Sequence, residues 1–282
     1  MNAISIPLLA ALLLMLANCG AQAAGNKSKA AAPSVQKKEL TPKDEFLLLQ
    51  KAAAQGVAEA QYSLGWMYSK GEVVLKDTAK SFEWFQKAAA QGHAGAQFFL
   101  GVMYAKGEGT SKNSAKAIEW FQKAATQGHA EAQFFLGVIY ASGEGVPKDV
   151  AKAMEWYQKA AAQGYAEAQY NLGWMYSNGE GMRKNIAKTF EWFQKAAAQQ
   201  HVEAQYNLGV MYRDGEGVTK DIAKAIEWLQ KAAAQQHAEA QYNLGLMYRD
   251  GEGVTKDATK AIEWFQKAAS QGHAKSQFLL NM

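Results

Sequence analysis

The sequence predicts an all-α solenoid of 36-residue helix-turn-helix repeats, because landmarks recur at a constant period along most of the chain. Leu-Gly pairs and tryptophans both recur every 36 residues. The pairs begin at Leu64, Leu100, Leu136, Leu172, Leu208 and Leu244, and the tryptophans are Trp84, Trp120, Trp156, Trp192, Trp228 and Trp264. A fixed period of roughly 20–50 residues is typical of repeat architectures, in which each unit buries its apolar face on its neighbours.

The first helix of each unit is predicted from apolar spacing. Ala132, Leu136, Ile139 and Tyr140 follow the i, i+4, i+7, i+8 pattern of an amphipathic helix. Gly143 comes next, and a glycine occupies the same position in all six full units. A left-handed C-cap is the usual role of such a glycine, so we expect the helix to end there.

The second helix of each unit is predicted from its N-cap. The turn before it ends at Asp77, Asn113, Asp149, Asn185, Asp221 and Asp257, all favourable N-cap residues. The helix then runs to a second glycine, which Gln200 and Gln236 replace in two units. Either the turn tolerates a non-glycine residue at these two positions, or it bends differently there.

Two glycine positions carry further expectations. The glycine of each Leu-Gly pair lies inside a helix, where it costs about 0.5–1 kcal/mol relative to alanine. We therefore expect the paired helix to approach closely, with its tryptophan packed alongside. In the turn, Val73 stands where five units have glycine. A β-branched residue is strained at positive φ, so the first turn should follow a different backbone path.

The chain divides into an export signal, a basic tether and the repeat region. These segments are 1–24, 25–43 and 44–282, the last comprising a lone helix at 44–55, six full repeats at 57–272 and a partial repeat at 273–282. The tether contains five lysines against Glu39 alone, which accounts for the whole net charge of +4. The repeats are formally neutral, whereas a nucleic-acid-binding domain would carry a basic face. No nucleic-acid partner is expected.

The first 24 residues predict export. An apolar run from Ile4 to Ala17 precedes Ala21-Gln22-Ala23, which fits the small-x-small cleavage pattern. The alternative is a lipid anchor, because the residues before Cys19 resemble a bacterial lipoprotein box, although Asn18 departs from it. The protein is therefore expected to be periplasmic or secreted, or else a membrane-anchored lipoprotein. Cys19 is the single cysteine, so no intramolecular disulfide is possible.

Repeated polar residues argue against a metal, cofactor or catalytic site. The five histidines share one repeat position: His93, His129, His201, His237 and His273. Neighbouring helices lie roughly 8–10 Å apart, too far for equivalent histidines to share a zinc ion. The repeated glutamates have equivalent surroundings, whereas general acid/base catalysis needs carboxylates in different environments. We expect structural or solvent roles for all of them.

The repeat unit AEAQYNLGxMYxxGEGVxKDxxKAxEWFQKAAxQG resembles the Sel-one-like repeat (SLR) family, relatives of the tetratricopeptide repeats. The resemblance covers about residues 44–282. It implies a right-handed α/α superhelical solenoid whose first helices line the concave face. It also implies an adaptor role in protein complexes, often in envelope assembly or host contact for secreted bacterial members. A cysteine-rich Helicobacter branch is linked to penicillin binding, but this chain lacks those cysteines.

Residues that differ between copies are the candidates for a binding face. Positions three, seven, ten and fourteen of the unit share one face of the first helix. The candidate partner-binding residues on and beside this face are Trp66, Phe99, Val102, Phe135, Val138, Asn171, Trp174, Asn207, Arg213, Asn243 and Arg249. Exposed aromatics favour a partner site. The alternative is that the phenylalanines fill gaps between repeats.

The sequence thus predicts a non-enzymatic scaffold that binds a protein or peptide on the concave face. Two alternatives are an envelope or cell-wall enzyme with β-lactamase-like activity and an assembly factor that uses the solenoid ends. The partial last repeat ends in apolar Phe278, Leu279 and Leu280. These residues either cap the last groove or form a homodimer contact.

Overall fold

The computed structural model describes residues 41–281, which form fourteen α-helices and, within that range, no β-strand. Helix α2 (Pro42–Ala54) precedes the repeats. The first helices of successive repeats are α3 (Ala58–Lys70), α5 (Ala94–Lys106), α7 (Ala130–Ser142), α9 (Ala166–Asn178), α11 (Val202–Asp214), α13 (Ala238–Asp250) and α15 (Ala274–Leu280). The second helices are α4 (Thr78–Ala90), α6 (Ser114–Thr126), α8 (Val150–Ala162), α10 (Ile186–Ala198), α12 (Ile222–Ala234) and α14 (Ala258–Ser270). The predicted all-α repeat fold is confirmed.

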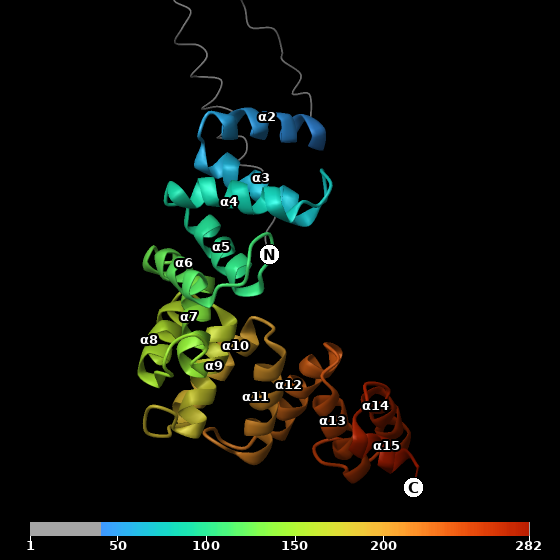
Figure 1. Ribbon diagram of the computed structural model, residues 1–282. Helices are drawn as coiled ribbons and strands as arrows, with labels where there is room; N and C mark the ends of the chain where they lie inside the picture. The colour runs from blue at the N-terminus through green and yellow to red at the C-terminus, as the bar shows by residue number, and fades with distance from the viewer. Residues whose placement is uncertain (1–40, 282) are drawn as a thin grey trace, which may run out of the picture. The chain divides into compact units, whose positions relative to one another are not determined.

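The helices belong to two compact units. The described part of one comprises residues 41–96 and 108–111, and that of the other comprises 97–107 and 112–281. In the second unit, each helix from α6 to α15 packs against the next one in sequence (Figure 1). In the first unit, α2 packs on α3 and α3 on α4. Packing between sequence neighbours is the arrangement that a solenoid requires.

Side-chain caps define where the helices begin. The Asp or Asn before each second helix accepts a backbone N–H three residues later, as Asp149 does from Lys152 at 3.0 Å. This confirms the predicted N-caps. Each first helix from α3 to α13 whose C-cap is described ends at a left-handed glycine, such as Gly143 with φ of 78°. The short turns between helices are thus fixed by the local sequence.

The glycine inside each first helix meets the second helix of its own repeat. A Cβ atom on Gly137 would lie 2.5 Å from the ring of Tyr157, and one on Gly173 would lie 2.5 Å from the ring of Phe193. The expected close approach is confirmed, but the expectation that tryptophan packs there was wrong. The residue after the tryptophan fills this space, while the tryptophan itself is half-buried, as Trp156 is. Lys159, for example, stands 4.1 Å over the ring of Trp156.

Buried glutamines join neighbouring repeats. Gln241 is 1% exposed, and its amide nitrogen donates to the Ala233 carbonyl of the preceding repeat at 3.1 Å. Its amide oxygen accepts from Gln271 at 2.6 Å. Gln133, Gln169 and Gln205 make the same pair of contacts. A buried amide without partners is costly, so these bonds favour one stacking register.

The structure shows the backbone conformation of the turns at Gln200, Gln236 and Val73. Gln200 and Gln236 adopt positive φ values of 67° and 66°, so the turn keeps its left-handed bend without glycine. Space allows this, because a Cβ atom on the equivalent Gly164 would meet nothing within 4 Å. Val73 is not among the residues with positive φ, whereas Gly109 has φ of 70°. The predicted difference in the first turn is confirmed.

The ends of the repeat region differ in detail from the predicted bounds. Helix α2 begins at Pro42 instead of Asp44, because Thr41 and Asp44 form a capping box. At the other end Phe278 is 66% exposed. The predicted export signal, the tether up to residue 40 and Cys19 lie outside the described residues. In the part of the chain that the structure describes, none of the helices combines the length and apolar character of a membrane span.

Candidate partner-binding face

Three exposed apolar side chains lie on the first helices of two consecutive repeats. Phe135 and Val138 of α7 are 36% and 37% exposed, and Trp174 of α9 is 48% exposed. Val138 and Trp174 occupy the same repeat position, and Phe135 lies one turn before Val138. The start of α9 contacts α7, since the rings of Phe134 and Tyr165 are 5.2 Å apart. We call Phe135, Val138 and Trp174 the α7–α9 face.

Phe135 packs against neighbouring aromatic rings and is also partly exposed to solvent. Its ring stacks on Phe121 of α6 at 5.4 Å and lies 5.7 Å from Phe98. A third of the side chain nevertheless remains exposed. The partner site and the gap between repeats are therefore compatible roles for Phe135, because its ring packs on neighbouring rings while part of the side chain faces solvent.

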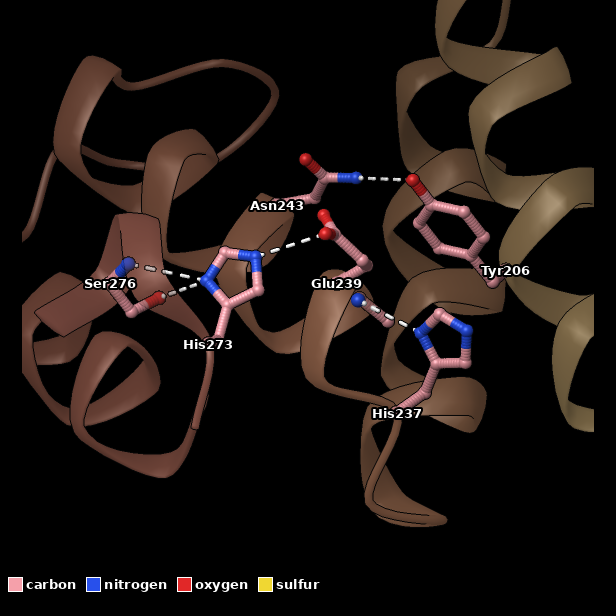
Figure 2. A network of polar contacts seen from close by, with 7 residues as sticks. Tyr206, His237, Glu239, Asn243, His273 and Ser276 are labelled. Carbon is pink, nitrogen blue, oxygen red and sulfur yellow. Dashed lines mark hydrogen bonds and ion pairs between the residues drawn. The ribbon is translucent and has the colours of Figure 1, made fainter. Parts of the chain in front are cut away.

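The equivalent residues of α9, α11 and α13 are asparagines engaged with tyrosines. A hydrogen bond from Asn171 partly offsets the burial that raises the pKa of Tyr157 to about 12. The Asn243 amide nitrogen lies 3.5 Å from the Tyr206 hydroxyl, and Asn243 is only 8% exposed (Figure 2). Asn207 interacts similarly with Tyr170. These amides connect successive repeats and offer less surface than Phe135.

The predicted arginines form local ion pairs. Arg213 donates to the carboxylate of Asp214 at 2.8 and 3.0 Å, and Arg249 does the same to Asp250 at 2.7 and 2.8 Å. These pairs lie at the ends of α11 and α13. The arginine charge is therefore already compensated on these two helices.

The remaining predicted binding residues are less exposed. Trp66 of α3 is half-buried, with the Lys70 ammonium 4.6 Å from the ring centre. Phe99 and Val102 of α5 are also half-buried. Trp66 belongs to the first unit, whereas Phe99 and Val102 belong to the second.

The histidines cap the first helices. The Nδ1 atom of His237 accepts the Ala240 backbone N–H at 3.2 Å (Figure 2). His93, His129, His201 and His273 make the equivalent bond. Each ring also packs on an aromatic ring of the preceding repeat, as His237 does on Tyr206 at 4.6 Å. The predicted structural role is confirmed.

Some capping histidines also contact a glutamate of the preceding repeat. His273 Nε2 lies 3.0 Å from the Glu239 carboxylate (Figure 2). His93 Nε2 likewise lies 3.0 Å from the Glu59 carboxylate. Since Nδ1 accepts a backbone N–H, Nε2 carries the proton and donates to the carboxylate. This hydrogen bond lowers the pKa of Glu59.

Tyr165 breaks this pattern beside the α7–α9 face. It stands where five repeats have histidine, and its side chain makes no cap at the start of α9. Glu131, the glutamate that such a histidine would face, has no hydrogen bond or ion pair among the described residues. Burial raises the pKa of Glu131, and the nearby charge of Glu167 raises it further. Burial likewise raises the pKa of Tyr165 to about 12.

Glu131 and Tyr165 were not among the predicted binding residues. The signal was present, because Tyr165 is an exception in a conserved-looking column of the repeat. Its meaning depends on the contact between a histidine and the preceding glutamate, which the sequence does not reveal. Among the described residues, no group of three or more His, Cys, Asp or Glu side chains is placed to hold a metal ion.

The repeat itself decides the family. The Sel1 repeat model matches seven segments, at 46–57, 58–93, 94–129, 130–165, 166–201, 202–237 and 238–273. The chain belongs to the Sel1 repeat family. Sel1 repeat proteins are typically protein-interaction scaffolds, and most are not enzymes.

Two solved structures resemble this Sel1 repeat protein over most of its length. One is c5321, a protective antigen present in uropathogenic Escherichia coli strains, with 38% identity and a TM-score of 0.80 over 84% of this chain. The match covers 51% of c5321, so the chain spans about half the length of that relative. The other is a Sel1 repeat protein from Oxalobacter formigenes, with 34% identity, a TM-score of 0.75 and coverage of 81% and 94%. No curated protein matches the chain.

Proposed function

We propose that this Sel1 repeat protein is an exported, non-catalytic scaffold that binds a protein or peptide segment through the α7–α9 face. The observation that carries the proposal is the exposure of Phe135, Val138 and Trp174 on adjacent first helices. Tryptophan and other aromatic residues dominate the binding energy of protein interfaces. Exposed aromatics in a scaffold family therefore point to a partner surface.

The repeat pattern supports this location. The equivalents of Phe135 in the next three repeats are asparagines, and the equivalents of Trp174 in those that follow are Val210 and Leu246. Stacking of the solenoid thus does not require an aromatic residue at either position. Large exposed side chains that stacking does not require are the expected marks of a binding surface.

Site-specific photo-cross-linking in the exporting cell tests the proposal. A photoreactive residue at Val138 should capture a defined partner, and Phe135→Ala combined with Trp174→Ala should abolish capture. The melting temperature should fall modestly, because Phe135→Ala removes the stacking on Phe121, whereas both side chains are otherwise partly exposed. The matched control is Val210→Ala with Leu246→Ala, which alters equivalent apolar positions outside the face. Equal capture by both double variants would refute the proposed location.

Export is the second part of the proposal and has its own test. It rests on the apolar run and the cleavage pattern of the first 24 residues, and the description of c5321 as a protective antigen supports it. Mass spectrometry of protein from a bacterial envelope fraction should give an N-terminus near Ala24. A lipid-modified Cys19 would instead support the anchored alternative, and an intact Met1 in the cytoplasm would contradict export.

A further inference from the structure

The glutamate beside the α7–α9 face lacks the histidine that its equivalents have. Glu59 lies 3.0 Å from His93, and Glu239 lies 3.0 Å from His273. The corresponding partner position of Glu131 is Tyr165, and no base pairs with Glu131 among the described residues. Among the glutamates at this repeat position, Glu131 is thus the one whose partner position in the next repeat holds no histidine.

This carboxylate is positioned next to the exposed apolar surface. Glu131, Phe135 and Val138 follow the i, i+4, i+7 spacing on α7 and so share one helix face. Glu167 precedes Trp174 by seven residues on α9 and lies on the matching face of that helix. Each helix thus presents a glutamate in its first turn and an exposed apolar residue farther along.

The surroundings of Glu131 favour a positive charge. The side chain is half-buried, and this burial raises the pKa of the Glu131 carboxyl. The nearby negative charge of Glu167 raises this pKa further. A partly desolvated carboxylate without a cationic partner gains more from an ion pair than a fully hydrated one does.

We propose that the α7–α9 face recognises a partner peptide in which a lysine or arginine lies beside large apolar residues. Glu131 and Glu167 bind the cationic side chain, while Phe135, Val138 and Trp174 contact the apolar ones. The inference rests on the proposed function and specifies the chemistry of the partner. It makes Glu131 the residue that determines specificity for charge.

Selection from a random peptide library on the immobilised full-length protein tests this specificity. Peptides are kept when they bind the native protein and fail to bind the Phe135→Ala, Trp174→Ala double variant. We expect the retained peptides to combine lysine or arginine with aromatic or aliphatic residues. Retained peptides that are neutral or acidic would overturn the inference and leave the proposed function intact. If no enriched peptide depends on Phe135 and Trp174, the proposed function itself fails.

The contribution of Glu131 is measured with the best retained peptide. Glu131→Gln should weaken binding about tenfold, because hydrogen bonds to charged groups are roughly twice as strong as neutral ones. Replacing the peptide's basic residue with glutamine should have a similar effect, and the two changes together should cost little more than either alone. Glu239→Gln is the matched control, since it removes the same charge at the same repeat position on α13. Equal losses from both variants would overturn the assignment of Glu131.

The chain's own lysine-rich tether is the other possible occupant. A synthetic peptide of residues 25–40 is therefore added as a competitor during the measurement. We expect no competition at concentrations near the Kd of the selected peptide. Full competition would reassign the face to a segment of this chain and overturn the proposal of a separate partner.

Discussion

The repeats around α7 and α9 differ from those around α11 and α13, although both sets share one backbone plan. At α11 and α13 the first helices begin at His201 and His237, and Asn243 bonds Tyr206 of the preceding repeat. On α7 the position of Asn243 holds exposed Phe135. Helix α9 begins at Tyr165, which makes no side-chain cap, and carries exposed Trp174 where α11 and α13 have Val210 and Leu246. The same scaffold thus satisfies its polar groups internally in one region and leaves apolar and charged groups available in the other.

The largest effect should come from a feature common to both regions. Gly137→Val and Gly245→Val each drive a side chain into a ring 2.5 Å from the new Cβ atom, that of Tyr157 or Phe265. Overpacking of this kind should lower the free energy of unfolding by about 2–3 kcal/mol in both cases. Urea denaturation measures the loss.

The exposed change Ala162→Val on α8 measures the cost of a helical valine that meets no ring, and it should be well under 1 kcal/mol. A large effect at Gly137 with none at Gly245 would show that the two regions are packed differently after all.

Acid should destabilise the histidine-capped repeats. Burial lowers the pKa of His201 and of His237, against the opposing influence of nearby Glu203. A lowered pKa favours the neutral ring in the folded state, so this stabilisation is complete above about pH 6.5 and is lost as the pH falls toward the folded pKa. We therefore expect the free energy of unfolding to fall between pH 7 and pH 5.

The variant His201→Asn with His237→Asn keeps an N-cap residue and removes the titration, so its stability should depend less on pH over this range. Thermal denaturation at several pH values compares the two proteins. Identical pH profiles would exclude the caps as the source of the dependence.

Tyr165→His should give the α7–α9 region the histidine–glutamate contact that α13 and α15 have. The substitution places an imidazole where His273 stands relative to Glu239, so Glu131 gains a hydrogen-bond donor. We expect the pKa of Glu131 to change from raised to lowered, as the pKa of Glu59 is lowered by His93. Carbon-13 NMR titration of the carboxyl measures it. An unchanged titration would mean that burial alone, without the missing partner, sets the behaviour of Glu131.

The smallest effect concerns a turn in the α11–α13 region. Gln236 adopts a φ of 66°, which is unfavourable for any residue with a Cβ atom. Gln236→Gly should therefore raise the free energy of unfolding by about 0.5–1 kcal/mol, less the entropy that glycine gains in the unfolded chain.

Gln235→Gly is the control, because Gln235 has a φ of −90° and donates to Gln205. It should destabilise. A loss of stability in Gln236→Gly as well would show that the glutamine side chain contributes contacts that outweigh the backbone strain.

The sequence predicted the parts of this molecule that depend on local chemistry. The N-caps at Asp149 and its equivalents, the left-handed glycines and the altered turn at Val73 follow from the preferences of single residues. The sequence did not predict which of two adjacent side chains would fill a given space between helices. Trp156 and Tyr157 are adjacent aromatics, and only the crossing of two helices decides that Tyr157 meets Gly137. Glu131 was missed for the same reason, since its significance lies in a contact with the next repeat.

The glutamine contacts have a consequence for how such a chain can change its length. Gln241 takes one partner from the preceding repeat, Ala233, and one from its own repeat, Gln271, the C-cap residue of α14. If a whole repeat is duplicated or deleted, every remaining glutamine finds the same two partners again. Growth by other than 36 residues would strand a buried amide. Evolution can therefore lengthen or shorten this scaffold in steps of one whole repeat.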